Sequence, residues 1–476
     1  MDLPLPDPWA EDCLNRKRFG ELLLACLQGD AVLSDEAFVV ALTGKFGAGK
    51  SHFLDMWGKH LLQKVGDDPQ KFPMVVTVNA WESDFSGEPL LALVSAISNQ
   101  LRVTREGKEE EAVKDLKRGL AGAVGVAKWA LGGLIEEKTG LPLEELTAAF
   151  VDGASGEELD RRANALLSEF RARKQSLEKL RSSLQQLIDS HSSADGQRGL
   201  KLILIVDELD RCNPRYAIEF LEAIKHVFNV RGMAVVLGVD WKQLGSAASA
   251  LFGHQLDIDE YLRKFIRRRV QLPEPGFYSI ASLCEKLTDA YFPPGRDCKS
   301  VYDLIRRQEG DPSRLLGCYA QMLRLTPRQC QSAISTLSFY YRMGESSPRW
   351  EMYSVDLFLV SLSVGIPSGF QGVVNCETEP IPAIEFLKSL RIAEVVGKHF
   401  NGEFIEARIL GALRSRENGK DFSALATKAG FKLGETVGNS MKITEIGKVL
   451  NVESGGDRSY AASVARKLLE LESFQS

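Results

Sequence analysis

The chain has 476 residues, of which 44% are hydrophobic and 26% charged, with a formal net charge of −5. This length predicts roughly two to four domains of ordinary globular composition. The mildly acidic balance argues against a broad nucleic-acid-binding surface, although nucleic acid binding through a local basic patch stays possible. The eight cysteines are scattered without metal-ligand spacing, so we expect reduced thiols in a cytoplasmic protein.

The first predicted elements are a helix, a buried strand and a second helix. Helical periodicity over residues 18–27 precedes a continuous apolar run at 38–42, which has the length of a strand. The glycine-rich segment GKFGAGKS, at 44–51, follows immediately and leads into an apolar-periodic helix. This order of strand, glycine loop and helix is the context that a phosphate-binding P-loop requires.

GKFGAGKS fits the P-loop pattern G-x-x-x-x-G-K-[ST] in full. Gly44, Gly47 and Gly49 allow the backbone to wrap a phosphate with its N–H groups pointing inward, and the N-terminus of the next helix favours the same anion. Lys50 is predicted to reach the β- and γ-phosphates, and the Ser51 hydroxyl to bind Mg²⁺. The other candidate nucleotide-binding residues of this segment are Lys45, Phe46, Ala48 and His52.

A second buried strand is predicted at 74–78, and Asn79, Trp81 and Glu82 come directly after it. Polar side chains at the carboxyl end of a strand in such a sheet face the ligand crevice. For the Trp81 ring we favour the alternative, a place in the core. A helix at 90–101 is predicted next.

Residues 106–200 are predicted to form a charged, mostly helical insertion. One helical face carries Phe170, Leu177, Leu180, Leu184 and Leu187. The segment 119–135 is the candidate membrane span, but it is short for a hydrocarbon core of roughly 30 Å. Its Lys128 would cost about 3 kcal/mol near the bilayer centre. We therefore do not expect membrane contact.

A third buried strand at 202–206 leads into Asp207 and Glu208. Asp207 is predicted to hold Mg²⁺ through its hydration shell, and Glu208 to orient or deprotonate an attacking water. An acidic strand-to-loop turn can also serve only for capping. Its combination with the P-loop favours a hydrolytic site.

The fourth predicted strand, at 234–239, ends at Asp240, for which two roles stay open. In P-loop ATPases with an additional strand, a polar residue at this position senses the γ-phosphate; otherwise Asp240 is the N-cap of the next helix. A fifth strand ends at 270–272 within the basic segment YLRKFIRRRVQLPEP. One of its arginines could stabilise transition-state charge, but a solvated basic face is the simpler explanation for each of them.

Buried strands alternating with helices predict an α/β fold whose parallel sheet is covered on both faces. We assign residues 1–105 and 201–273 to this P-loop NTPase domain. Helical periodicity dominates afterwards, which predicts a helical lid module at 274–347 and a mostly helical C-terminal domain at 348–476. Arg328, at a helix start in LTPRQC, is a further candidate catalytic arginine that senses the nucleotide.

Taken together, the motifs resemble the KAP family of P-loop NTPases, in the additional-strand, catalytic-glutamate division. The matching stretches are DCLNR at 12–16, GKFGAGKS, VNAWESD, DELDRCNPRYAIEFLEAIKHVFNV, VVLGVD, YLRKFI, LP at 272–273 and PR at 327–328. The resemblance covers roughly residues 12–334. It implies ATP as the nucleotide, Mg²⁺ bound through Ser51 and Asp207, and hydrolysis using Glu208. It also implies a place for Arg16 near the nucleotide base.

Many members of this family carry transmembrane helices between the second strand and the DELDR strand, and the short, charged segment 119–135 departs from that pattern. Bacterial members often belong to anti-phage defence systems. We expect an ATPase whose hydrolysis cycle switches conformation or assembly and controls a protein partner or a homo-oligomer. The alternative is an ATP-dependent oligomerisation switch or scaffold with negligible hydrolysis.

Overall fold

The computed structural model describes residues 6–68, 72–102, 156–190, 199–292, 312–343, 353–375, 380–400, 402–413, 426, 428–429, 436–437, 441–442 and 460–473. The chain divides into two compact units. The first comprises Met1–Asp12 and Arg16–Pro273, and the second comprises Cys13–Asn15 and Glu274–Ser476.

A parallel five-stranded sheet forms the centre of the first unit, with strand order β2-β3-β4-β1-β5. Its strands are β1 Phe38–Thr43, β2 Met74–Asn79, β3 Leu202–Asp207, β4 Met233–Val239 and β5 Arg268–Gln271. All residues of β1 and β4 are buried. A strand buried on both faces is uniformly apolar, which is why these strands can be recognised from sequence. The α/β prediction is confirmed.

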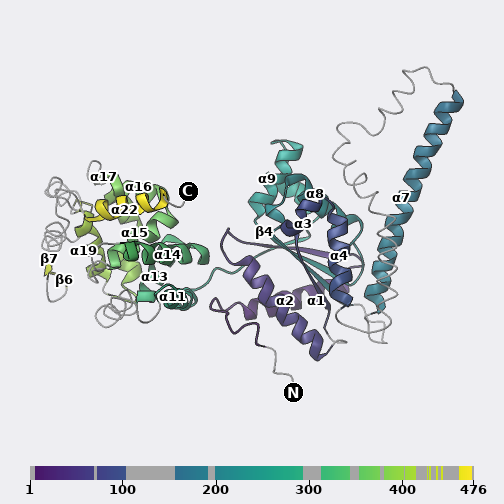
Figure 1. The fold of residues 1–476 in the computed structure, drawn as a ribbon. Helices are drawn as coiled ribbons and strands as arrows, with labels where there is room; N and C mark the ends of the chain where they lie inside the picture. Colours follow the sequence, from purple (N-terminus) through teal and green to yellow (C-terminus); the bar gives the residue numbers. More distant parts are fainter. Residues whose placement is uncertain are drawn as a thin grey trace. The chain divides into compact units, whose positions relative to one another are not determined.

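Helices cover both faces of this sheet (Figure 1). They are α1 Lys17–Leu33, α2 Lys50–Asp67, α3 Ala80–Ser83, α4 Pro89–Arg102, α7 Gly156–Ser190, α8 Pro214–His226, α9 Trp241–Phe252 and α10 Ile258–Arg263. Because strand side chains alternate between the faces, each face has its own core. Val40 and Val236 pack with Leu27 of α1 and Trp57 of α2 on one face.

On the opposite face, the neighbouring strand residues Ala41 and Val235 pack with α4, α8, α9 and part of α7. In α7, Leu180, Leu184 and Leu187 are buried in this core, as their shared helical face predicts. Residues 103–155, which include the segment 119–135, lie outside the described residues. In the part of the chain that the structure describes, no helix has the combination of length and apolar character that crossing a bilayer requires.

The described elements of the second unit are helices and one short antiparallel strand pair (Figure 1). They are α11 Phe277–Tyr291, α13 Pro312–Leu323, α14 Pro327–Met343, α15 Tyr353–Gly365, α16 Pro367–Val374, α17 Pro380–Leu390, α18 Ile392–Val396, α19 Gly402–Leu413, β6 Thr436–Val437, β7 Met441–Lys442 and α22 Tyr460–Ser473. Residues 353–363 of α15 are all buried, which is typical of a helix surrounded by other helices. One hydrophobic core contains buried residues from both 274–347 and 348–476.

Candidate functional site

The segment 44–51 joins the end of β1 to the start of α2. Gly47 and Gly49 have φ values of +76° and +85°, in the left-handed region that glycine adopts without steric cost. Gly49 is the N-cap residue of α2. The Lys50 Nζ donates to the Gly44 carbonyl at 2.9 Å, so this side chain folds back over its own loop.

Arg16 holds the outer side of this loop. Its Nη2 donates to the Ala48 carbonyl at 2.7 Å and its Nη1 to the Gly49 carbonyl at 3.0 Å. In a trans peptide the N–H points away from the C=O, so the N–H groups of Gly49 and Lys50 point to the opposite side of the loop. Burial lowers the Arg16 pKa to about 10, which leaves the guanidinium charged at neutral pH. Its contacts are with the loop backbone, and a place near the nucleotide base stays a prediction.

Ser51 and Asp207 come together from α2 and β3. The Asp207 Oδ1 accepts from the Glu208 N–H at 2.9 Å. Burial raises the Asp207 pKa, while the nearby Ser51 side chain and the bond from the Glu208 N–H act in the opposite direction. A hydroxyl oxygen beside a carboxylate is a donor set that suits Mg²⁺. The residues present therefore fit this cation.

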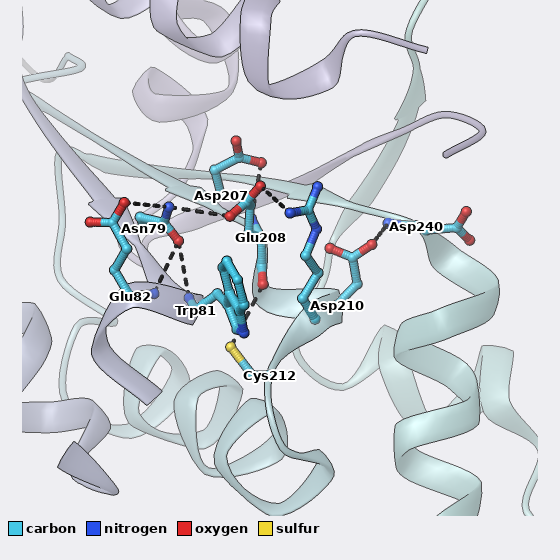
Figure 2. Close-up of polar contacts among 9 residues, drawn as sticks. Asn79, Trp81, Glu82, Asp207, Glu208, Asp210, Cys212 and Asp240 are labelled. Carbon is cyan, nitrogen blue, oxygen red and sulfur yellow. Dashed lines mark hydrogen bonds and ion pairs between the residues drawn. The ribbon is translucent and has the colours of Figure 1, made fainter. Parts of the chain in front are cut away.

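Glu208 has an unusual backbone conformation, and each of its carboxylate oxygens has a protein partner. Its φ of 60° lies in the left-handed region, where a non-glycine residue is strained and such strain is often associated with function. Its Oε1 pairs with the Arg211 Nη1 at 2.8 Å, and its Oε2 accepts from the Asn79 Nδ2 at 3.2 Å. Figure 2 shows Asn79 between Glu208 and Glu82. Asn79 can reach Glu208 because β2 and β3 are paired neighbours, with Asn79 opposite Asp207.

Asn79 also begins helix α3. Its side-chain oxygen accepts from the backbone N–H groups of Trp81 and Glu82, at 3.1 and 3.3 Å, and its Nδ2 donates to the Glu82 Oε1 at 3.1 Å. The expectation that the Trp81 ring lies in the core is wrong, because 53% of this residue is exposed. The physical reason is its position: α3 starts where the sheet ends, and the ring lies beside the Arg211 guanidinium, 5.9 Å from ring centre to carbon.

Asp240 serves as the N-cap of α9. Its Oδ1 accepts from the N–H groups of Lys242 and Gln243, at 2.9 and 3.4 Å. Its own N–H donates to the Asp210 Oδ2 at 2.9 Å, which ties the end of β4 to the segment after β3 (Figure 2). The capping alternative is therefore confirmed, and the γ-phosphate sensor role stays a prediction.

The basic segment around β5 has local partners. Arg267 pairs with Glu36, Arg268 lies 3.5 Å from the Asp30 carboxylate, and Arg269 lies over the Trp241 ring at 4.9 Å. These contacts support a structural basic face at the sheet edge. Arg328 lies in the first turn of α14, in the second unit, and its role stays a prediction.

The thiol of Cys212 lies against the Glu208 carbonyl, with its Sγ at 3.6 Å. Burial raises its pKa to about 12. It is thus a neutral thiol at physiological pH. Cys212 therefore supports the turn after β3 and is not activated as a nucleophile.

Three comparisons place these observations among known proteins. A family model, the KAP family P-loop domain, matches residues 21–343. The Phage T7 exclusion protein of Escherichia coli (strain K12) is 27% identical over an alignment of 172 residues, which covers 34% of this chain and 21% of the relative. A solved structure of the Aeropyrum pernix ORC2 protein (ADPNP-ADP complexes) aligns with 96% of this chain and 94% of its own at 12% identity and a TM-score of 0.33, too low for an argument.

The family match includes the glycine loop, the end of β2, and the Asp207–Glu208 pair, and it spans more than half of the 476 residues. Gly47 and Gly49 of the loop adopt backbone angles that suit phosphate binding, and the Ser51 hydroxyl and the Asp207 carboxylate lie near each other. The chain therefore belongs to the KAP family of P-loop NTPases, a family of nucleotide-binding P-loop proteins.

Proposed function

We propose that the chain binds ATP with Mg²⁺ on residues 44–51 and hydrolyses it. One observation carries this proposal: Asp207 ends β3 near the Ser51 side chain at the start of α2, with Glu208 as the next residue. Metal-ligand oxygens beside a candidate base are what phosphoryl transfer to water needs. ATP in preference to GTP follows from the family.

Each residue has a definite part in the proposed reaction. The loop N–H groups and Lys50 bind the phosphates, and Ser51 and Asp207 hold Mg²⁺, which neutralises phosphate charge. Glu208 orients a water for attack on the γ-phosphorus and accepts its proton as the bond to the β-phosphate oxygen breaks. Arg16 keeps the loop backbone in the conformation that presents its N–H groups.

The test is Mg²⁺-dependent phosphate release by the purified protein and by Glu208→Gln. A lost general base reduces turnover by about 10²–10⁴-fold, while binding of a fluorescent ATP analogue should be retained. Glu260→Gln is a matched control, because it makes the same change at an exposed position in α10. Absent phosphate release from the wild type, or equal release by Glu208→Gln, would refute the hydrolytic function.

A second function has one observation in its favour. Both carboxylate oxygens of Glu208 are already engaged, by Arg211 and Asn79, as suits a switch that holds ATP and seldom hydrolyses it. In that case nucleotide state would set assembly. Light scattering with ADP and with a non-hydrolysable ATP analogue should then give different masses, with turnover near background.

The biological role that we propose is control of a partner in defence against phage. It rests on the family and on the relative, whose name describes exclusion of phage T7. Plaque counts on cells expressing the wild type should fall relative to Lys50→Ala, which lacks the phosphate-binding lysine. Equal plaque counts across a phage panel would contradict this role. Affinity purification of Glu208→Gln with ATP would then identify the partner.

A further inference from the structure

Arg211 lies where three parts of the site meet. It belongs to the short 3₁₀ turn Leu209–Arg211 after β3. Its guanidinium carbon is 5.7 Å from the centre of the Phe46 ring and 5.9 Å from that of the Trp81 ring. Its Nη1 pairs with the Glu208 Oε1 at 2.8 Å. One side chain thus links the P-loop, the turn after β2 and the candidate base.

The aromatic contacts orient the guanidinium. A planar cation over an aromatic face is attracted by the electrons of the ring, and both rings are largely exposed, Phe46 by 60% and Trp81 by 53%. Here they hold the arginine so that its Nη1 faces Glu208.

Both oxygens of the Glu208 carboxylate have a partner, because Asn79 donates to Oε2 at 3.2 Å while Arg211 pairs with Oε1. A general base must have an oxygen within hydrogen-bond reach of the water that it deprotonates. Arg211 already occupies one side of Oε1 at 2.8 Å, so the ion pair competes with a water for this oxygen.

We propose that Arg211 is a positioning residue that restrains Glu208 until the P-loop binds a triphosphate. This inference rests on the proposed hydrolysis. Phe46 is the third residue of GKFGAGKS, so a triphosphate bound by this loop lies in the same segment as the ring beside the guanidinium. The negative charge of the triphosphate then competes with Glu208 for the Arg211 cation and releases the Glu208 Oε1. The Arg211 side chain thus couples binding of a triphosphate in the P-loop to the availability of the Glu208 carboxylate.

The first test compares steady-state ATP turnover of the wild type and Arg211→Gln. Release of the restraint should raise kcat by about three- to tenfold, the equivalent of about 0.7–1.4 kcal/mol, with little change in KM. Arg215→Gln is the matched control, since Arg215 pairs with Glu219 on α8. An unchanged or lower kcat in Arg211→Gln, with a normal control, would overturn the proposal.

Two further variants separate restraint from a general loss of structure. Arg211→Lys keeps the charge but loses the planar fork, so its kcat should lie between those of the wild type and Arg211→Gln. In an Arg211→Gln, Glu208→Gln double variant the gain should vanish, because the restraint acts on Glu208. A gain that persists in the double variant would show that Arg211 acts elsewhere and would overturn the proposal.

A measurement that does not depend on ATP turnover tests this proposal separately from hydrolysis. The fluorescence emission of Trp81 should change when a non-hydrolysable ATP analogue and Mg²⁺ are added. This emission is measured as the difference between the wild type and Trp81→Phe. The same difference in an Arg211→Gln background should not change. If the wild type hydrolyses no ATP but shows this response, hydrolysis is refuted and the coupling stands; without the response, the coupling is refuted.

Discussion

At the scale of single residues, Gly238 leaves the space that the carboxylate of the candidate metal ligand Asp207 needs. It lies opposite Asp207 in the pairing of β3 with β4. A Cβ atom at Gly238 would lie 2.6 Å from the Asp207 Oδ1 and 2.5 Å from the Leu54 Cδ1. Both distances are too short for real contacts, so a larger residue must displace the carboxylate.

Gly238→Ala should therefore weaken Mg²⁺-dependent nucleotide binding and lower the free energy of unfolding by about 1–3 kcal/mol. Nucleotide titration with and without Mg²⁺, together with denaturant unfolding, measures both effects. Gly29→Ala is the control: it lies inside α1 with nothing within 4 Å of its Cβ, so it should be neutral or slightly stabilising. Unimpaired Mg²⁺ dependence in Gly238→Ala would contradict this account.

Arg16 offers a second prediction at this scale. Its planar fork donates to two carbonyls of the P-loop, whereas lysine, a single point donor, cannot reproduce both bonds. Arg16→Lys should weaken ATP-analogue binding by about tenfold, the effect of losing one charge-assisted hydrogen bond. Arg18→Lys is the matched change at an exposed position of α1. Equal affinities of the two variants would refute the role.

At the scale of elements, Asp356 joins three helices of the second unit. It is buried in α15 and accepts hydrogen bonds from Tyr341 of α14, at 3.1 Å, and from Tyr460 of α22, at 2.9 Å. Burial raises its pKa from 3.8 to about 7, against the effect of the two hydrogen bonds. Folding therefore favours its protonated form.

The sign of the pH effect follows from linkage. The folded state binds the Asp356 proton more tightly than the unfolded state does, so the contribution of Asp356 to stability is greatest at low pH and declines as pH rises from about 4 to about 7. The decline is at most about 4 kcal/mol. Denaturant unfolding at several pH values should show it in the wild type.

Asp356→Asn should lack this part of the pH dependence, while Asp289→Asn, at an exposed position of α11, should keep it. The difference in unfolding free energy between the wild type and Asp356→Asn is the quantity to plot. A difference that is constant across this pH window would contradict the buried-carboxyl explanation.

The elements themselves were predictable to different degrees. The buried strands were found within one or two residues, since an uninterrupted apolar run is a local signal. Helix α1 continues to Leu33, beyond the predicted end at residue 27, although Gly29 and Asp30 are weak helix formers. Its buried Ala31 shows the cause: packing in the core overrides local propensity.

At the scale of the whole molecule, the second unit has its own hydrophobic core, separate from the two cores around the sheet. A fragment of residues 274–476 should therefore unfold cooperatively when expressed alone. Its thermal transition, followed by circular dichroism, is the measurement. A fragment cut at residue 347 is the comparison and should not show such a transition, because the core contains residues from both sides of that position. Equal cooperativity of the two fragments would refute a shared core.

The sequence by itself determined the α/β fold of the first unit, the P-loop and the acidic pair Asp207–Glu208. These depend on residues close together in the chain: a strand, a glycine spacing, a strand end. Only the tertiary structure decided that Asn79 bonds to Glu208, that Arg16 holds the loop, and that Arg211 lies between Phe46 and Trp81. The physical reason is that these contacts join segments that are distant in the chain and meet only in the folded structure. The pairing of β2 with β3 joins residues separated by 129 positions, and no local pattern encodes it.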